Sequence, residues 1–254
     1  MSKTTWAPEI ADCSAVLADM DGVLVLGANA APGAGALLQL AGEKLVVVTN
    51  ESARSSLELS CDFRDRGLAI SPEQIVTAGE RAIEELKLKA RDACIMVRGA
   101  PILQSMVTSA DLRLWSSGDK ADVVLLGRDP NFGPDALVEA TRAIEDGAQL
   151  WVTNTDLRHP VGNGRYTYQT GALLAALRAC VGDVPMTVVG KPSPGLFHDA
   201  LRLLDARPQD AIMIGDNPVT DGLGAKASGI RFIEIGNSHT ADAISLDALL
   251  ASAN

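Results

Sequence analysis

The sequence is poor in cysteine and in basic residues, and each shortage excludes a class of protein. The four cysteines form no C-x-x-C pair, which argues against a zinc site or a disulfide framework, and we expect reduced core thiols at Cys13, Cys61, Cys94 and Cys180. Lysine and arginine number 22 against 32 acidic residues, so the net charge is −10. Nucleic acids and anionic membranes need a basic surface, so we expect neither as a partner. A small molecule is the expected partner. It can still be an anion, because a local cation and backbone N–H groups can bind an anion on a protein of negative net charge.

The sequence also lacks long apolar runs. None approaches the roughly 20 residues that span a bilayer. Residues 1–11 show no basic segment followed by an apolar stretch, the mark of a secretory leader. We therefore expect a cytoplasmic protein without a membrane-spanning segment. With 254 residues and 47% hydrophobic content, the chain can form one large or two modest domains.

Short apolar runs alternate with helical segments along the chain. The runs do not alternate polar with apolar residues, which is typical of strands covered on both faces. Strands followed by helices predict a doubly wound parallel sheet, an α/β fold. For the two ends of the chain we expect strands at 15–18, 45–48, 75–77, 187–189, 211–214 and 232–235, and helices at 34–40, 52–66, 79–89, 193–204 and 241–250.

The sequence pattern changes at about residue 91, in the middle of the chain. We expect a second α/β unit there, with strands at 94–97, 111–115, 123–126 and 150–153 and helices at 102–109, 134–145 and 170–179. Residues 154–165 are too polar and too rich in turn formers for a regular element. Such a long loop is usually functional or mobile.

Polar side chains follow several of the predicted strands. Asp19 and Asp21 come after the first strand, and residues two apart in an extended segment face the same side. Two carboxylates so close raise each other's pKa unless a cation lies between them. The other strand ends carry Thr49 with Asn50, Lys191, and Asp216 with Asp221. Each could be a helix cap or a surface charge, but together they predict a ligand site at the carboxyl edge of the sheet.

These residue types suit phosphoryl transfer through an aspartyl-phosphate. Asp19 can be the carboxylate nucleophile, and Asp21 the acid and base. Thr49 offers a hydroxyl and Lys191 a fixed positive charge for the transferring group.

A cation would also fit this edge of the sheet. Asp216 and Asp221 can hold a hard ion that takes oxygen ligands and retains waters, and this indicates Mg²⁺. The ion would remove the repulsion between the first two carboxylates, because Asp19 can bind it while Asp21 turns toward the substrate.

The motifs around these residues resemble those of the haloacid dehalogenase-like phosphatases, within them the NagD-like branch. The resemblance covers nearly the whole chain and is carried by D-x-D-G-V at 19–23, P-G-A at 32–34, T-N at 49–50, F-G-P-D at 132–135, T-N-x-D at 153–156, V-G-K-P-S-P at 189–194 and G-D-N-x-x-T-D at 215–221. It implies a Rossmann-like catalytic core at 1–89 and 182–254, an inserted α/β cap at 90–181, Mg²⁺, and hydrolysis of phosphate monoesters.

The resemblance also implies a role for each motif residue. Asp19 would be the nucleophile and a metal ligand, and Asp21 the acid and base and a metal ligand through its carbonyl. Thr49 and Lys191 would bind the phosphoryl group; Asp216 would complete the protein ligands of the metal, with Asp221 orienting a metal-bound water. We assign Asn50 to the catalytic set and Gly22 to substrate binding. The chain departs from its relatives at Glu51 and at Tyr168-Gln169.

The polar loop at 154–165 in the cap would bind the leaving group and distinguish one substrate from another. Asp156, Arg158 and His159 offer an acceptor, a cation and a titratable donor. The alternative is that Arg158 and Asp156 are solvated loop charges and that only Gly162 and Gly164 matter, for the turn. Relatives act on sugar phosphates, nucleoside monophosphates, phosphoglycolate, pyridoxal phosphate and aryl phosphates such as p-nitrophenyl phosphate. Nothing in the sequence selects one small phosphorylated metabolite. Relatives often form homodimers through the cap.

Two other classes of function use the same fold and motifs. A phosphotransferase or phosphomutase would use the same residues with an acceptor other than water, and a binding module would retain the fold without catalysis. A carbon–halogen hydrolase would not need Asp21. Because the complete set of catalytic residue types is present, we predict a phosphatase.

Overall fold

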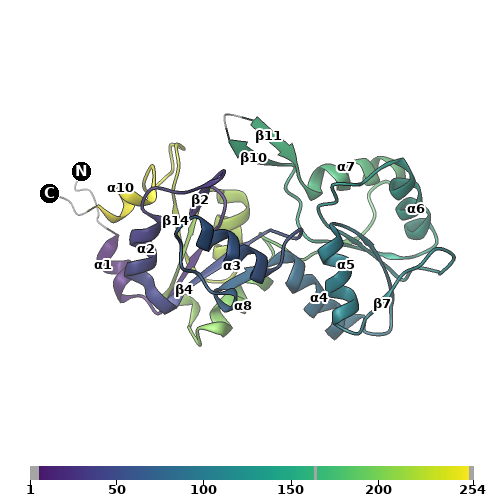
Figure 1. Cartoon of the computed structure of the whole chain (residues 1–254), viewed down its shortest axis with the longest axis horizontal. Coiled ribbons are helices and arrows are strands. Elements are labelled where there is room, and N and C mark those ends of the chain that lie inside the picture. The colour runs from purple at the N-terminus through teal and green to yellow at the C-terminus, as the bar shows by residue number, and fades with distance from the viewer. Residues whose placement is uncertain (1–5, 163–164, 252–254) are drawn as a thin grey trace. The chain divides into compact units, whose positions relative to one another are not determined.

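The computed structural model describes residues 6–162 and 165–251, and the chain divides into two compact units. Unit 1 comprises Met1–Thr49, Ser56–Val76 and Lys191–Asn254, and unit 2 comprises Asn50–Ser55 and Thr77–Gly190. Both are built on five-stranded sheets flanked by helices (Figure 1), which confirms the predicted α/β class.

Unit 1 has a sheet in the order β14-β13-β1-β4-β5 and a small antiparallel pair, β2 with β3. Its central strands are parallel, and β1 pairs with β13 from Ala15↔Ala211 to Ala18↔Ile214. The elements are α1 (Ala7–Asp12), β1 (Ala15–Ala18), β2 (Val25–Leu26), β3 (Asn29–Ala30), α2 (Ala34–Ala41), β4 (Leu45–Thr49), α3 (Ser56–Asp65), β5 (Ile75–Thr77), α8 (Gly195–Leu203), β13 (Ala211–Gly215), β14 (Arg231–Glu234) and α10 (Leu246–Leu250), with 3-10 turns at Gly42–Lys44, Pro72–Gln74 and Pro208–Asp210. One turn of π-helix, Pro218–Gly222, leads into α9 (Leu223–Ala227).

The strands of unit 1 are buried on both sides, as their unbroken apolar sequences predict. All four residues of β1 and all five of β4 are buried. One face packs with α2, α3 and α10 in a core that includes Leu37, Phe63 and Leu246, and α8 contacts β1 and β4. This burial holds the carboxyl ends of β1, β4 and β13 firmly in place.

Unit 2 has a parallel sheet in the order β12-β9-β8-β6-β7. One face packs against α4 and α5 and the other against α6 and α7 (Figure 1). The elements are α4 (Ala78–Lys89), β6 (Cys94–Arg98), α5 (Pro101–Ser109), β7 (Arg113–Leu114), β8 (Val123–Leu126), α6 (Pro134–Glu145), β9 (Gln149–Val152), β10 (Arg158–Gly162), β11 (Arg165–Tyr168), α7 (Thr170–Val181) and β12 (Met186–Val188).

The two units divide at different residues from those expected. The sequence places helix 79–89 and strand 187–189 in the catalytic core, with the cap at 90–181, whereas α4 and β12 both belong to unit 2. The reason is packing: Ile83 and Leu86 of α4 share a core with Ile95 of β6, and β12 pairs with β9. An apolar pattern shows that a helix has a buried face without showing which sheet covers it.

Residues 154–165 contain regular structure where an irregular loop is expected. Their described part includes β10, which forms an antiparallel hairpin with β11. A two-stranded hairpin buries few side chains, and those of β11 are mostly exposed, so the hydrophobic pattern does not reveal it.

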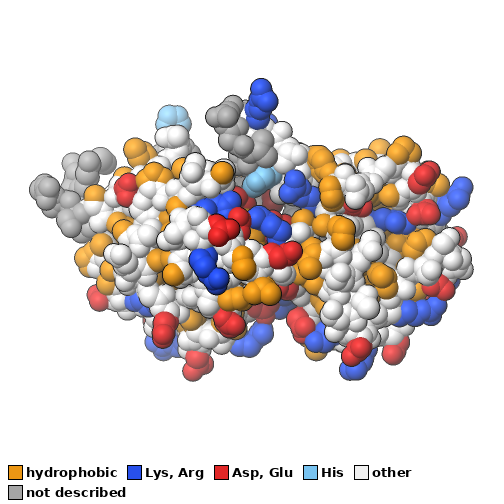
Figure 2. Space-filling model, in the orientation of Figure 1, with side chains coloured by type: hydrophobic (Ala, Val, Ile, Leu, Met, Phe, Trp, Pro, Cys, Tyr) orange, Lys and Arg blue, Asp and Glu red, His pale blue; other side chains and the backbone are white. Residues whose placement is uncertain are grey.

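The burial of the cysteines agrees only in part with the expectation of core thiols. The four cysteines are free, but only Cys94 is buried; Cys61 and Cys180 are exposed. Figure 2 shows Lys and Arg side chains interspersed with Asp and Glu over the face drawn. Within the described residues, no helix is long and apolar enough to cross a membrane.

Candidate active site

Asp19 stands at the centre of the polar residues on the sheet of unit 1. It directly follows β1, and its backbone N–H donates to the Ile214 carbonyl at 2.9 Å, which fixes it beside β13. The carboxylate oxygen Oδ1 accepts hydrogen bonds from the Met20 N–H and from Lys191 Nζ, both at 2.7 Å. The other carboxylate oxygen accepts no hydrogen bond from the described residues.

Lys191 lies between two carboxylates. Its side chain is only 2% exposed, and Nζ is 2.7 Å from Asp19 Oδ1 and 2.7 Å from Asp221 Oδ1. Burial lowers the pKa of Lys191, but the charges of Asp19 and Asp221 outweigh burial and hold the pKa above its usual value. Lys191 is therefore a permanent cation beside Asp19.

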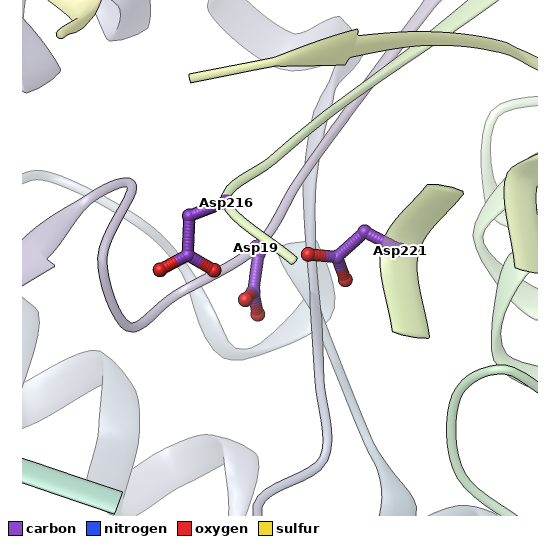
Figure 3. Close-up of side chains that lie close together, drawn as sticks. All are labelled: Asp19, Asp216 and Asp221. Atoms are coloured by element: carbon purple, nitrogen blue, oxygen red, sulfur yellow. The ribbon is translucent and has the colours of Figure 1, made fainter. Parts of the chain in front are cut away.

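Three carboxylates converge at this point. One oxygen from each of Asp19, Asp216 and Asp221 lies within 4.8 Å of the others, and Figure 3 shows the Asp19 carboxylate between the other two. Loss of hydration raises the pKa of Asp216 to about 7, and the charge of Asp19 adds to it, although the residue is exposed. Burial raises the pKa of Asp221 to about 7, with Asp19 adding to the shift and Lys191 opposing it. One lysine does not neutralise three carboxylates.

The three carboxylates fit a hard divalent cation. Oδ1 of Asp221 is buried and makes no directed hydrogen bond among the described residues, only the ion pair with Lys191. Carboxylate oxygens are the ligands that Mg²⁺ prefers, and an ion here would remove the surplus negative charge. Asp19 and Asp216 offer the more accessible oxygens, because Asp221 is fully buried.

Gly22 makes room for one of these carboxylates. Its φ is +83°, a conformation that favours glycine, and its N–H donates to the Val25 carbonyl at 2.9 Å. A Cβ at this position would lie 2.6 Å from Cγ of Asp216. Gly22 is expected to bind substrate, and that role stays a prediction; what the structure adds is that a side chain at this position would meet Asp216. An Asp-Gly pair after a strand indicates only a turn, so the proximity of Gly22 to Asp216 could not be predicted from the sequence.

Two further predicted residues lie at the same edge of unit 1. Thr49 is the last residue of β4 and is 3% exposed. Asp21 forms a β-bridge with Val25 and is half-buried. Its carboxylate is not one of the three that lie within 4.8 Å of one another among the described residues, and its role as acid and base stays a prediction.

The other predicted site residues belong to unit 2. Asn50 Nδ2 donates to Asp156 Oδ2 at 2.9 Å, and the Asn50 carbonyl accepts from Asn154 Nδ2 at 2.9 Å. Asn154 is 1% exposed. Asn50, expected in the catalytic set, thus holds Asp156, expected to bind substrate, in a defined orientation.

Arg158 and His159 are consecutive residues of β10. Side chains of consecutive strand residues point to opposite faces, and substrate binding by these two residues stays a prediction. The Arg158 guanidinium lies 4.2 Å from the centre of the Tyr166 ring, and His159 is half-buried.

The two departures from the family pattern both have structural partners. The Glu51 carboxylate accepts the N–H groups of Ser52 and Ala53 at 2.8 and 2.7 Å and pairs with Arg54 at 2.7 Å. Tyr168 donates its hydroxyl to the Asp129 carbonyl at 3.0 Å. Both departures therefore support the local backbone.

Comparison with known proteins identifies the family. Residues 16–113 match a model described as haloacid dehalogenase-like hydrolase, and residues 188–248 match one described as HAD-hydrolase-like. Chronophin from Homo sapiens is 34% identical over 235 residues, which cover 86% of this chain and 79% of chronophin. The chain belongs to the haloacid dehalogenase-like hydrolase family.

Two solved structures define the branch. Glycerol phosphate phosphatase from Mycobacterium tuberculosis, in complex with magnesium, is 29% identical with a TM-score of 0.82, covering 91% of this chain and 69% of that one. NagD from E. coli K-12 is 25% identical with a TM-score of 0.80, covering 92% and 97%. Within its family the chain is a phosphatase of the NagD-like branch, as its motifs predict.

Proposed function

We propose that this protein hydrolyses small phosphate monoesters through an aspartyl-phosphate on Asp19, with Mg²⁺ as cofactor. The observation that carries the proposal is the position of Asp19, 2.7 Å from a buried lysine and beside two further carboxylates at the end of β1. A carboxylate in this setting can attack phosphorus while neighbouring charges hold the phosphoryl oxygens.

In the first step, an Asp19 oxygen forms a bond to phosphorus as the bond from phosphorus to the leaving oxygen breaks. Asp21, two residues on, donates a proton to that leaving oxygen. Lys191 and the Thr49 hydroxyl bind the phosphoryl oxygens, on which charge accumulates in the transition state.

In the second step, water replaces Asp19 on phosphorus. Asp21, now ionised, accepts a proton from the attacking water, the bond from phosphorus to Asp19 breaks, and inorganic phosphate leaves. Asp19 returns to a free carboxylate, so atoms and charge balance over the cycle.

The divalent ion would be held by Asp19, by Asp216, and by Asp221 directly or through water, with the Asp21 carbonyl as a further predicted ligand. When bound, it supplies positive charge that neutralises the phosphoryl oxygens. The magnesium complex of the mycobacterial relative supports this choice of ion.

The substrate is a small phosphorylated metabolite. Glycerol phosphate, named for the mycobacterial relative, is one such compound. We propose that unit 2 is the cap, and that Asp156, held by Asn50, and His159 contact the leaving group. Homodimer formation through the cap and a cytoplasmic location stay predictions; sedimentation and cell fractionation test them.

The test is turnover of p-nitrophenyl phosphate by the full chain, with Mg²⁺ and with EDTA. We expect activity that requires the metal and falls below about a thousandth of the wild-type rate in Asp19→Asn, because an amide is a far weaker nucleophile. Asp183→Asn is the matched control, because Asp183 is 93% exposed and pairs only with Arg178 among the described residues. Full activity in EDTA or in Asp19→Asn would refute the metal or the covalent mechanism, respectively.

A further inference from the structure

The connection from β7 to β8 leaves part of the sheet of unit 2 without a covering helix. Strand β6 lies between these two strands, so the chain must cross the face of β6 to join them. Parallel strands are usually joined by a dozen or more residues that include a helix. Here residues 115–122, all described, make the crossing without one. A hollow is left between this crossing segment and α6, and Figure 1 shows α6 and β7 at the right-hand end of unit 2.

The hollow is a pocket of about 550 Å³ whose lining residues all belong to unit 2. This volume is typical of small-molecule sites, which measure about 300–1,000 Å³. The base of the pocket is apolar, because Met96 of β6, Ala121 and Ala143 line it and are each more than nine-tenths buried. Trp115 and charged side chains of the crossing segment and of α6 line the rest. An apolar base with an aromatic wall and a charged rim suits a small amphipathic ligand.

Trp115 is held in one orientation in the wall of the pocket. Its Nε1 donates to the Asp119 carbonyl at 2.9 Å, and the Arg98 guanidinium lies 5.5 Å from the centre of its ring. Arg98 is itself paired with Glu139 at 2.6 Å, and the Asp119 carboxylate is paired with Arg113 at 3.1 Å. Trp115 is only half-buried, so part of the ring is accessible. A ring fixed in this way loses little conformational freedom when a second ring stacks on it.

The remaining charges that line the pocket do not balance. Lys120, Arg142 and Asp146 are exposed, and their side chains make no ion pair or hydrogen bond within the described parts of the chain. Asp146 lies one helical turn after Arg142, so it can offset one of the two cations. The pocket therefore has one positive charge in excess.

We propose that this pocket binds a small planar aromatic compound that carries one anionic group, a carboxylate or a phosphate. The ring would stack on Trp115 above the apolar base, and the anion would lie between Lys120 and Arg142. Such a ligand matches both the accessible aromatic surface and the excess positive charge. Asp19 and the other residues of the proposed reaction do not line the pocket, so the inference goes beyond the proposed function and does not depend on it.

The test is isothermal titration calorimetry of the full chain in EDTA with four probes. 2-Naphthoate and 2-naphthylphosphonate carry the ring with a carboxylate or a phosphorus anion, and the phosphonate has no ester bond to hydrolyse. Cyclohexanecarboxylate lacks the aromatic ring, and 2-naphthylmethanol lacks the charge. We expect wild type to bind at least one aromatic anion with a Kd below about 1 mM, and the two reference compounds at least about threefold more weakly. The aromatic anion that binds more tightly identifies the anionic group.

Two variants locate the binding in the pocket. Lys120→Gln combined with Arg142→Gln should raise the Kd about 3- to 10-fold, because two exposed attractions are lost. Trp115→Ala should also raise the Kd about 3- to 10-fold, through the loss of ring stacking. Arg91→Gln combined with Lys226→Gln is the matched control. It removes the same charge from exposed positions outside the pocket and should retain the wild-type Kd.

Three results would overturn the inference. Failure of wild type to bind either aromatic anion with a Kd below about 1 mM would exclude the site. Equal affinity for the reference compounds would exclude recognition of an aromatic anion. A wild-type Kd in the variant that lacks both rim cations, with its fold checked by thermal unfolding, would place the binding elsewhere. Because Lys120 and Arg142 are exposed, this variant decides the question even if Trp115→Ala fails to fold.

Discussion

Replacing Gly22 by alanine should weaken metal binding through the carboxylate that the glycine accommodates. The added Cβ would lie 1.9 Å from Oδ2 and 2.6 Å from Cγ of Asp216 in the observed geometry. Ordinary contact between carbon atoms needs about 3.5 Å, so the carboxylate must move by at least about 1 Å. Mg²⁺ demands near-octahedral ligands at about 2.0–2.1 Å, and a shift of that size removes one of them.

The Gly22→Ala variant should also be less stable, since φ is +83° at this position. A non-glycine residue in the left-handed region costs about 1–2 kcal/mol, which lowers Tm by about 2–8 °C in a chain of this size. Gly67→Ala is the matched control. Gly67 has a φ of +77°, but its Cβ would meet no atom within 4 Å. It should lose similar stability and leave the metal site intact.

The assay is a Mg²⁺ titration of p-nitrophenyl phosphate turnover for both variants, with thermal unfolding in EDTA alongside. We expect half-saturating Mg²⁺ to rise at least about tenfold in Gly22→Ala, equivalent to about 1.4 kcal/mol, and to stay at the wild-type value in Gly67→Ala. If both variants required the same Mg²⁺ concentration as wild type, the contact between Gly22 and Asp216 would have no part in metal binding.

Three further predictions concern residues of the candidate active site. Without metal, the raised pKa values of Asp216 and Asp221, about 7 against 3.8, mean that the folded state binds protons more tightly than the unfolded chain. Their contribution to stability is thus complete below about pH 4 and is lost as the pH rises through 7. The Tm measured in EDTA should therefore fall from pH 6 to pH 8, and saturating Mg²⁺ should reduce that fall. A Tm that rises from pH 6 to pH 8 in EDTA would contradict the prediction. Asp21→Asn should slow the hydrolysis of alkyl phosphates more than that of p-nitrophenyl phosphate, whose leaving group needs little protonation. Equal losses of rate on both kinds of substrate, measured in stopped assays, would exclude the acid role of Asp21. Asn50→Ala should change the ratio of kcat/KM between two substrates through release of Asp156, at about 0.5–1.5 kcal/mol, whereas an equal loss on both would indicate a role in the core chemistry.

The central strands of both sheets could be predicted because their burial is complete or nearly so. All four residues of β8 and all five of β4 are buried, so unbroken apolar sequence marks each strand. Asp19 and Asp216 follow such strands directly. Their meeting at one edge is a consequence of parallel pairing, which the alternation of strands and helices already predicts.

Features that depend on contacts distant in sequence could not be predicted. The hairpin of β10 and β11 is stabilised by backbone pairing between mostly polar residues, and β12 looks the same in sequence whichever sheet it joins. The start of the final helix could not be predicted either. It begins only at Leu246, capped by Ser245, although apolar residues start earlier.

The pairing of β1 with β13 joins the two ends of the chain, with Ala15 beside Ala211. During synthesis, residues 15–18 therefore emerge long before their partner strand exists. The strands of the unit 2 sheet all lie between Cys94 and Val188, so that sheet can assemble while the other is incomplete. At about 5–20 residues per second, β1 waits roughly ten seconds or more with an unpaired apolar edge. We expect nascent chains released before residue 211 to be prone to aggregation and to lack the carboxylate cluster entirely.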